Sequence, residues 1–292
     1  MNVPESDELH AIHKNDSLQQ SCLLQTKDLS VAPGTQEQNV SDYVGDSASK
    51  NFLLKKVNIC IEPNKVTYLV GPNGAGKSVL LNTIAGNPLL KVVEGKIFYN
   101  GKDVINLQPH ERAKLGIFMI FQRPVQIPEI TVRQYFTAIY ENKHFKDRGN
   151  GTLKNNLDKN KLNDTFVQIL KEVDLPASVL DKPLNVDISG GQQKKLEVAT
   201  MLLVKPKLVL IDELDSGLDI NSEKLLFGII KDYLEQQKAT AIVVSHNFRS
   251  LNILPADSVY LVKNGSVSGP LPVTIINSIV EKGFQGDKNI GR

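Results

Sequence analysis

Residues 71–78 read Gly-Pro-Asn-Gly-Ala-Gly-Lys-Ser and stand between an apolar run at 65–70 and a helical pattern that begins at residue 78. This is the phosphate-binding loop pattern G-x-x-x-x-G-K-[ST] in the strand–loop–helix setting that it requires. Its glycines let consecutive backbone N–H groups turn towards an anion, and the following helix adds its positive N-terminus. We therefore expect a phosphate cradle made of Gly71, Pro72, Asn73, Gly74, Ala75, Gly76, Lys77, Ser78 and Val79.

Two acidic residues close another apolar run. Residues 208–211 read Leu-Val-Leu-Ile and are followed by Asp212 and Glu213. Because ligands of parallel sheets bind at the C-terminal ends of the strands, we expect Asp212 and Ser78 to ligate Mg²⁺. Glu213 is the expected general base on the attacking water, and Lys77 the expected contact to the β- and γ-phosphates. Taken alone, Asp212 and Glu213 could equally be two solvated acids at the end of a strand. In a chain that also has a phosphate loop, the acidic pair favours a nucleotide hydrolase.

The composition narrows the classes of function. The chain has 292 residues, 41% of them hydrophobic, and a formal net charge of +2. So small a charge gives no argument for a nucleic-acid partner or for an anionic membrane surface. No segment approaches the roughly 20 apolar residues of a membrane span, so we expect no direct membrane insertion. Residues 1–20 are polar, lean acidic and contain no apolar core of a signal peptide, which predicts a disordered tail.

The cysteine usage favours a reducing compartment. Cys22 and Cys60 lie far apart in the sequence, and neither belongs to a Cys-x-x-Cys pair. Cys60 falls in an alternating strand pattern, so we expect an inert, buried or half-buried thiol there rather than a metal ligand. These features predict a soluble protein of the cytoplasm or of a plastid-type organelle.

Strand and helix patterns alternate along most of the chain, which predicts an α/β fold with a mostly parallel sheet. The polar stretch at 32–50 is predicted to be a long loop, and the helical patterns at 131–142 and 162–173 form an insertion. We expect a single domain over 21–286, with a helical subdomain at about 123–188 and a short C-terminal tail at 287–292. The strand patterns lie at 23–31, 57–61, 66–70, 96–99, 116–121, 208–211, 241–244 and 259–262.

A second candidate phosphate site follows the helical insertion. Ser189-Gly190-Gly191-Gln192 opens a helical pattern, with Ser189 as its expected N-cap and two glycines that let an anion approach the backbone. These residues, with Ile188 before them, resemble the Leu-Ser-Gly-Gly-Gln signature of the ABC-type ATPases. In that family, the signature of one subunit closes over the nucleotide on the phosphate loop of another. The resemblance therefore implies that two complete sites need a second copy of the chain.

The same resemblance assigns the remaining motifs. It implies that Gln122 is the Q-loop glutamine, that residues 216–219 are the D-loop and that His246 senses the γ-phosphate. It also implies a P-loop NTPase fold with a RecA-like core, an antiparallel β subdomain and an inserted α-helical subdomain. The expected ligands are ATP and Mg²⁺. The resulting set comprises catalytic Glu213, His246, Gln122 and Lys77, magnesium-binding Ser78, Gln122 and Asp212, and nucleotide-binding Ser189, Gly190, Gly191 and Gln192.

Two longer stretches resemble one branch of the family, the iron–sulfur cluster assembly ATPases of the SufC type. They are residues 116–128 around the Q-loop and residues 212–220 around the acidic pair. This resemblance implies an ATPase that drives SufB/SufD-like scaffold proteins. The sequence departs from that branch at Gln192, where a glutamate is usual, and in the longer loop at 32–50.

Three hypotheses stay open from the sequence. The first is the SufC-type ATPase, and the second is the ATP-binding subunit of a membrane ABC transporter, which shares every catalytic residue. The third is a nucleotide-gated scaffold with negligible turnover. Tyr43 is a weak candidate for stacking on adenine, because an exposed loop tyrosine explains it as well.

Overall fold

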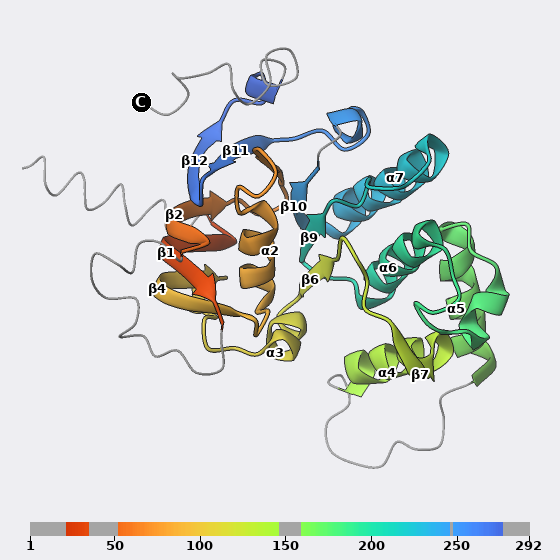
Figure 1. Ribbon diagram of the computed structural model, residues 1–292. Coiled ribbons are helices and arrows are strands. Elements are labelled where there is room, and N and C mark those ends of the chain that lie inside the picture. Colours follow the sequence, from red (N-terminus) through yellow and green to blue (C-terminus); the bar gives the residue numbers. More distant parts are fainter. Residues whose placement is uncertain (1–21, 35–51, 146–158, 246–247, 277–292) are drawn as a thin grey trace, which may run out of the picture. The chain divides into compact units, whose positions relative to one another are not determined.

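The computed structural model describes residues 22–34, 52–145, 159–245 and 248–276 (Figure 1). The predicted tails, Tyr43 and His246 lie outside these residues. The described residues fall into two compact units: those up to residue 115, those at 240–244 and those from 256 on make up unit 1, and those within 116–239 and 245–255 make up unit 2. Among the described residues, no helix is both long and apolar enough to cross a membrane.

Unit 1 contains the predicted antiparallel sheet. Its strands run in the order β2-β1-β4-β5. The first two residues of the loop predicted at 32–50, Ala32 and Pro33, belong to strand β1 instead. Helix α2 packs against β4 (Figure 1). The sheet consists of β1 (Leu24–Pro33), β2 (Leu54–Ile61), β4 (Leu90–Tyr99) and β5 (Lys102–Asp103), and the helices of this unit are α2 (Lys77–Ala85) and α3 (Pro109–Lys114).

Unit 1 also contains the parallel strands that lead into the phosphate loop. Strand β3 lies between β10 and β11, parallel to both, with Tyr68 opposite Val243 and Leu69 opposite Tyr260. β12 closes the edge antiparallel to β11. All five residues of β10 and four of the five in β3 are buried, as expected for central strands of a parallel sheet. These strands are β3 (Val66–Val70), β10 (Thr240–Val244), β11 (Ser258–Lys263) and β12 (Ser266–Leu271).

Unit 2 combines a parallel strand pair with a group of helices. β6 and β9 pair in parallel, and the helix α6 contacts α4, α5 and α7. The rings of Phe136 and Phe166 pack edge to face at 5.4 Å between centroids and join α4 to α5. The elements are β6 (Ile117–Ile120), β7 (Ile127–Thr131), α4 (Val132–Phe145), α5 (Lys159–Glu172), η3 (Ala177–Asp181), β8 (Pro183–Leu184), α6 (Gly190–Val204), β9 (Leu208–Asp212), α7 (Ile220–Gln237) and η4 (Phe248–Asn252).

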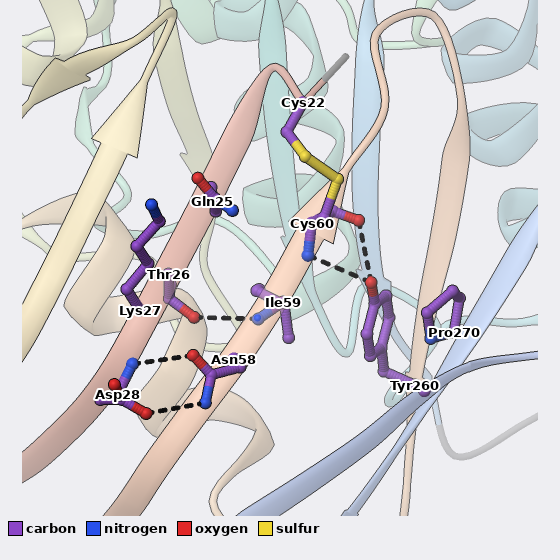
Figure 2. A pocket seen from close by; sticks show the side chains of 11 residues that line it. Cys22, Gln25, Thr26, Lys27, Asp28, Asn58, Ile59, Cys60, Tyr260 and Pro270 are labelled. Carbon is purple, nitrogen blue, oxygen red and sulfur yellow. Dashed lines mark hydrogen bonds between the residues drawn. A yellow bond between two sulfur atoms is a disulfide. The ribbon is translucent and has the colours of Figure 1, made fainter. Parts of the chain in front are cut away.

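The expectation of an inert thiol at Cys60 is wrong. Cys22 and Cys60 form a disulfide with their Cα atoms 5.4 Å apart (Figure 2). The reason is the antiparallel register of β1 and β2, which pairs Gln25 with Cys60 and so brings the residues before β1 beside the end of β2. The two cysteines meet although 38 positions separate them in the sequence.

Candidate functional site

The phosphate loop in unit 1 needs glycine at two positions for different reasons. A Cβ on Gly71 would lie 2.0 Å from the carbonyl oxygen of Val262, so the fold excludes any side chain there. Gly76 has a left-handed φ of 110° and is the N-cap of α2. A glycine N-cap offers no side-chain acceptor to the first helical turn, which suits a bound phosphate.

The loop also has an open position and an internal cation. A Cβ on Gly74 would meet nothing within 4 Å, which leaves the loop's tip open to a ligand. Lys77 is only 5% exposed, and its Nζ donates hydrogen bonds to the carbonyl oxygens of Gly71 at 2.8 Å and Pro72 at 2.9 Å. The ammonium therefore lies inside the loop. Glycine backbone, helix N-terminus and buried cation together fit the phosphates of a nucleotide.

The acidic pair belongs to unit 2, where β9 ends. Asp212 is the last residue of the strand and is 3% exposed. Glu213 follows with a left-handed φ of 49°, a conformation that costs a residue other than glycine about 1–3 kcal/mol. Its carboxylate oxygen Oε2 accepts a hydrogen bond from Nε2 of Gln122 at 2.5 Å. The structure thus brings Gln122 and Glu213, two residues of the predicted site, within hydrogen-bond distance of each other.

The Ser189 motif is built as a helix start. Ser189 Oγ accepts a hydrogen bond from the Gln192 backbone N–H at 3.3 Å, and Gln192 Oε1 accepts one from the Ser189 N–H at 3.1 Å. This reciprocal capping box begins α6 and uses the side chain of Gln192. A Cβ on Gly190 would meet nothing within 4 Å, and one on Gly191 only Leu218 Cδ2 at 3.6 Å. The fold of this chain therefore does not require either glycine.

Comparison with known proteins assigns the family. The model of the ABC transporter family matches residues 54–216. Over 238 residues, the chain is 33% identical to an Escherichia coli (strain K12) protein called probable ATP-dependent transporter SufC, covering 82% of this chain and 94% of that one. The chain belongs to the ABC transporter family. It is an ABC-type ATPase, and the predicted enzyme class is confirmed.

Further relatives and solved structures agree with this assignment. The chain is 32% identical over 232 residues to the iron–sulfur cluster assembly protein SufC of Plasmodium falciparum (80% of this chain, 65% of that protein). It is 35% identical over 233 residues to the probable ATP-dependent transporter ycf16 of Cyanidium caldarium (80% and 89%). A dimeric ATP-binding cassette in a post-hydrolysis state with ADP and Pi has a TM-score of 0.65 at 23% identity (84% and 97%). The predicted ABC-ATPase fold is confirmed.

In this ABC-type ATPase, a buried lysine that the sequence did not single out for a structural role supports the acidic pair. Lys194 on α6 is 6% exposed, and its Nζ donates hydrogen bonds to three backbone carbonyls. They are those of Glu213 at 2.9 Å, Leu214 at 2.8 Å and Ser216, with a very short contact. Burial lowers the pKa of Lys194, against the charges of Asp215 and Glu213, which raise it. Its signal in the sequence is a lysine on the apolar face of α6, one and two turns before Val198 and Met201.

Replacing this ammonium tests its role. We expect Lys194→Met to lower kcat about tenfold or more with little change in ATP affinity, because three carbonyls that shape the segment after β9 lose their donor. Lys195→Met is the matched control, since the neighbouring Lys195 pairs with the exposed Asp174 and contributes little. Steady-state ATPase kinetics of both variants make the comparison. Equal losses in the two would show that Lys194 has no special role.

Side chains of α6 and of the segment before it bind residues on either side of Gln122. The N–H of Phe121 donates to Glu197 Oε2 at 3.4 Å, and Asn185 Nδ2 donates to the carbonyl of Val125 at 2.8 Å. Gln193 Nε2 in turn donates to the carbonyl of Asn185 at 2.8 Å. Helix α6 thus contacts Phe121 directly and Val125 only through Asn185, and no local sequence pattern indicates these tertiary contacts.

Glu197 makes the stability of the protein depend on pH. Burial raises its pKa to about 7, against the hydrogen bond from the Phe121 N–H, which lowers it. Because the folded-state pKa lies above the usual value of 4.5, the folded protein binds more protons between these two values. Its stability contribution is therefore lost as the pH rises through about 7. We expect thermal unfolding at a series of pH values to show a shallower decline for Glu197→Gln than for the wild type; parallel profiles would contradict this assignment.

Proposed function

We propose that this chain hydrolyses MgATP within a SUF-type iron–sulfur cluster assembly machinery. The observation that carries the hydrolytic part is the hydrogen bond between Gln122 and Glu213 at the end of β9. It fixes a carboxylate beside an amide, which suits a general base and a water-positioning group. Similarity to two proteins named SufC supports the assignment to this branch.

Each residue of the site has a proposed step. Lys77, with the loop glycines, binds the β- and γ-phosphates, and its charge stabilises the negative charge that develops on the γ-phosphate. Gln122 orients the attacking water, and Glu213 accepts its proton. His246, which lies outside the described residues, keeps its predicted role as γ-phosphate sensor.

Magnesium fits the donors that this chain offers. Asp212 supplies carboxylate oxygens, Gln122 an amide oxygen and Ser78 a hydroxyl, and Mg²⁺ prefers such oxygen ligands. We propose that these three residues hold the ion when ATP binds. Ser78, Gln122 and Asp212 would thus hold an ion whose positive charge would offset the negative charge of the β- and γ-phosphates.

We further propose that ATP joins two copies of the chain through the signature motif. Gly190 and Gly191 have no steric role in their own chain, so their missing side chains leave room for another molecule at the N-terminus of α6. A phosphate held by the partner's loop has the chemistry that this open, electropositive helix start accepts. Dimer formation with ATP and separation after hydrolysis would then supply mechanical work.

The proposed partners are SufB/SufD-like scaffold proteins that bind near the Q-loop. Phe121 is 37% exposed and Val125 is 64% exposed, on either side of Gln122, and they offer an apolar contact to a partner. Movement of that contact would reach Glu213 through Gln122.

Affinity purification of the tagged full-length chain from its own cells tests the partner assignment. Mass spectrometry should identify SufB/SufD-like proteins in stoichiometric amounts, and Val125→Asp should reduce their recovery while ATP binding is retained. Stoichiometric recovery of a membrane-embedded permease instead would overturn the SUF assignment in favour of a transporter subunit.

A further inference from the structure

The cysteines of the disulfide in unit 1 border two hollows of the surface. Cys22 and Cys60 are both half-buried and border a groove of about 420 Å³, together with Lys27, Asn58 and Tyr260 (Figure 2). A second hollow of about 110 Å³ is bordered by Cys22 and Lys27 but not by Cys60. Of the two cysteines, Cys22 is therefore the one that borders both hollows.

The charges around the pair favour the same sulfur. A thiolate attacks a disulfide along the S–S axis and displaces the far sulfur, so access and local charge decide which cysteine reacts. Lys27 borders both hollows and attracts an anionic thiolate, whereas the carboxylate of Asp28 borders only the larger groove. The smaller hollow beside Cys22 is thus bordered by the cationic Lys27 but not by Asp28.

The disulfide is also tied to the strand beside the phosphate loop. The N–H of Cys60 donates to the hydroxyl of Tyr260 at 3.1 Å, and that hydroxyl donates to the carbonyl of Cys60 at 2.9 Å. Tyr260 lies on β11 opposite Leu69 of β3, and Val262, two residues on, has its carbonyl against Gly71. The end of β2 that carries the disulfide is thereby connected to the start of the phosphate loop within unit 1.

We propose that Cys22–Cys60 is a site of thiol–disulfide exchange at which a dithiol reductant attacks the sulfur of Cys22. One thiolate of the reductant forms a bond to Cys22 Sγ, the bond to Cys60 breaks, and Cys60 leaves as a thiolate that takes up a proton. The second thiol of the reductant, once deprotonated, displaces Cys22. Two electrons and two protons reach the cysteine pair, and the reductant becomes a disulfide. Reduction releases the covalent closure between β1 and β2 without unfolding unit 1.

A trapping experiment identifies the attacked sulfur. The folded full-length protein, purified without reductant, is treated briefly with the monothiol glutathione, quenched with iodoacetamide and mapped by mass spectrometry. We expect the mixed disulfide on Cys22 and the alkyl group on Cys60, in at least fivefold excess over the opposite pattern. A preference for Cys60, reaction only after a denaturant is added, or free thiols in the starting protein would overturn the proposal.

Rates of reduction by dithiothreitol test the contribution of Lys27. We expect Lys27→Gln to slow reduction about threefold at low salt, with the difference vanishing in 1 M salt. Lys102→Gln is the matched control, because Lys102 is exposed on β5 and borders neither hollow.

Reduction should also lower the unfolding temperature by roughly 6 °C, because the disulfide then no longer closes a loop in the unfolded chain. Equal rates in the two variants, or an unchanged unfolding temperature, would contradict the proposal. None of these readouts depends on ATP hydrolysis.

Discussion

Glu213→Gln is expected to lower the steady-state rate of ATP hydrolysis by roughly 10³-fold while ATP binding is retained. The glutamine side chain still offers an oxygen to Nε2 of Gln122, which Glu213 now contacts at 2.5 Å. The local geometry is therefore kept, and the ability to accept a proton from water is lost. Phosphate release measures the rate, and a fluorescent ATP analogue measures binding.

The control for this variant is Glu235→Gln, a change of the same kind at an exposed position of α7. It should leave the rate unchanged. If Glu213→Gln released phosphate as fast as the wild type, Glu213 would not be the general base. A rate of phosphate release that is negligible in the wild type as well as in Glu213→Gln would favour the nucleotide-gated scaffold.

Gly190→Asp is expected to lower the steady-state rate of ATP hydrolysis at least about 100-fold without loss of stability. A Cβ at Gly190 meets nothing within 4 Å, so the side chain fits the fold. A carboxylate in the first turn of α6 even favours the helix, because it interacts well with the helix dipole. The same negative charge repels a phosphate that approaches from a second chain.

Gly228→Asp is the matched control for this variant. Gly228 lies on α7, and a Cβ there also meets nothing within 4 Å. We expect both variants to unfold near the wild-type temperature and only Gly190→Asp to lose activity. Full activity of Gly190→Asp would show that the signature motif does not contact the nucleotide.

Local sequence patterns predicted much of this molecule, because its motifs are contiguous. The loop at 71–78, the acids at the end of β9 and the capped start of α6 each depend on residues a few positions apart. Strand–helix alternation predicted the α/β class for the same reason, and the likeness to solved ATP-binding cassettes confirms it.

The features that the sequence did not predict depend on tertiary contacts. The disulfide follows from the register of β1 and β2 across 38 positions, and no spacing rule links Cys22 to Cys60. Lys194 has its role only because α6 packs where three carbonyls after β9 converge. The left-handed φ of Glu213 is likewise imposed by its surroundings, since its residue type does not favour that conformation.

We propose that one ATP site combines the phosphate loop of one chain with the signature motif of another. Mixing two inactive variants, Glu213→Gln and Gly190→Asp, tests it most directly. In the mixed dimer, the intact Glu213 of one chain faces the intact Gly190 of the other, which rebuilds one complete site. We expect an equimolar mixture to regain about a quarter of the wild-type ATPase rate, since half of the dimers are mixed and each has one working site. A mixture that stays at the level of the separate variants would contradict it.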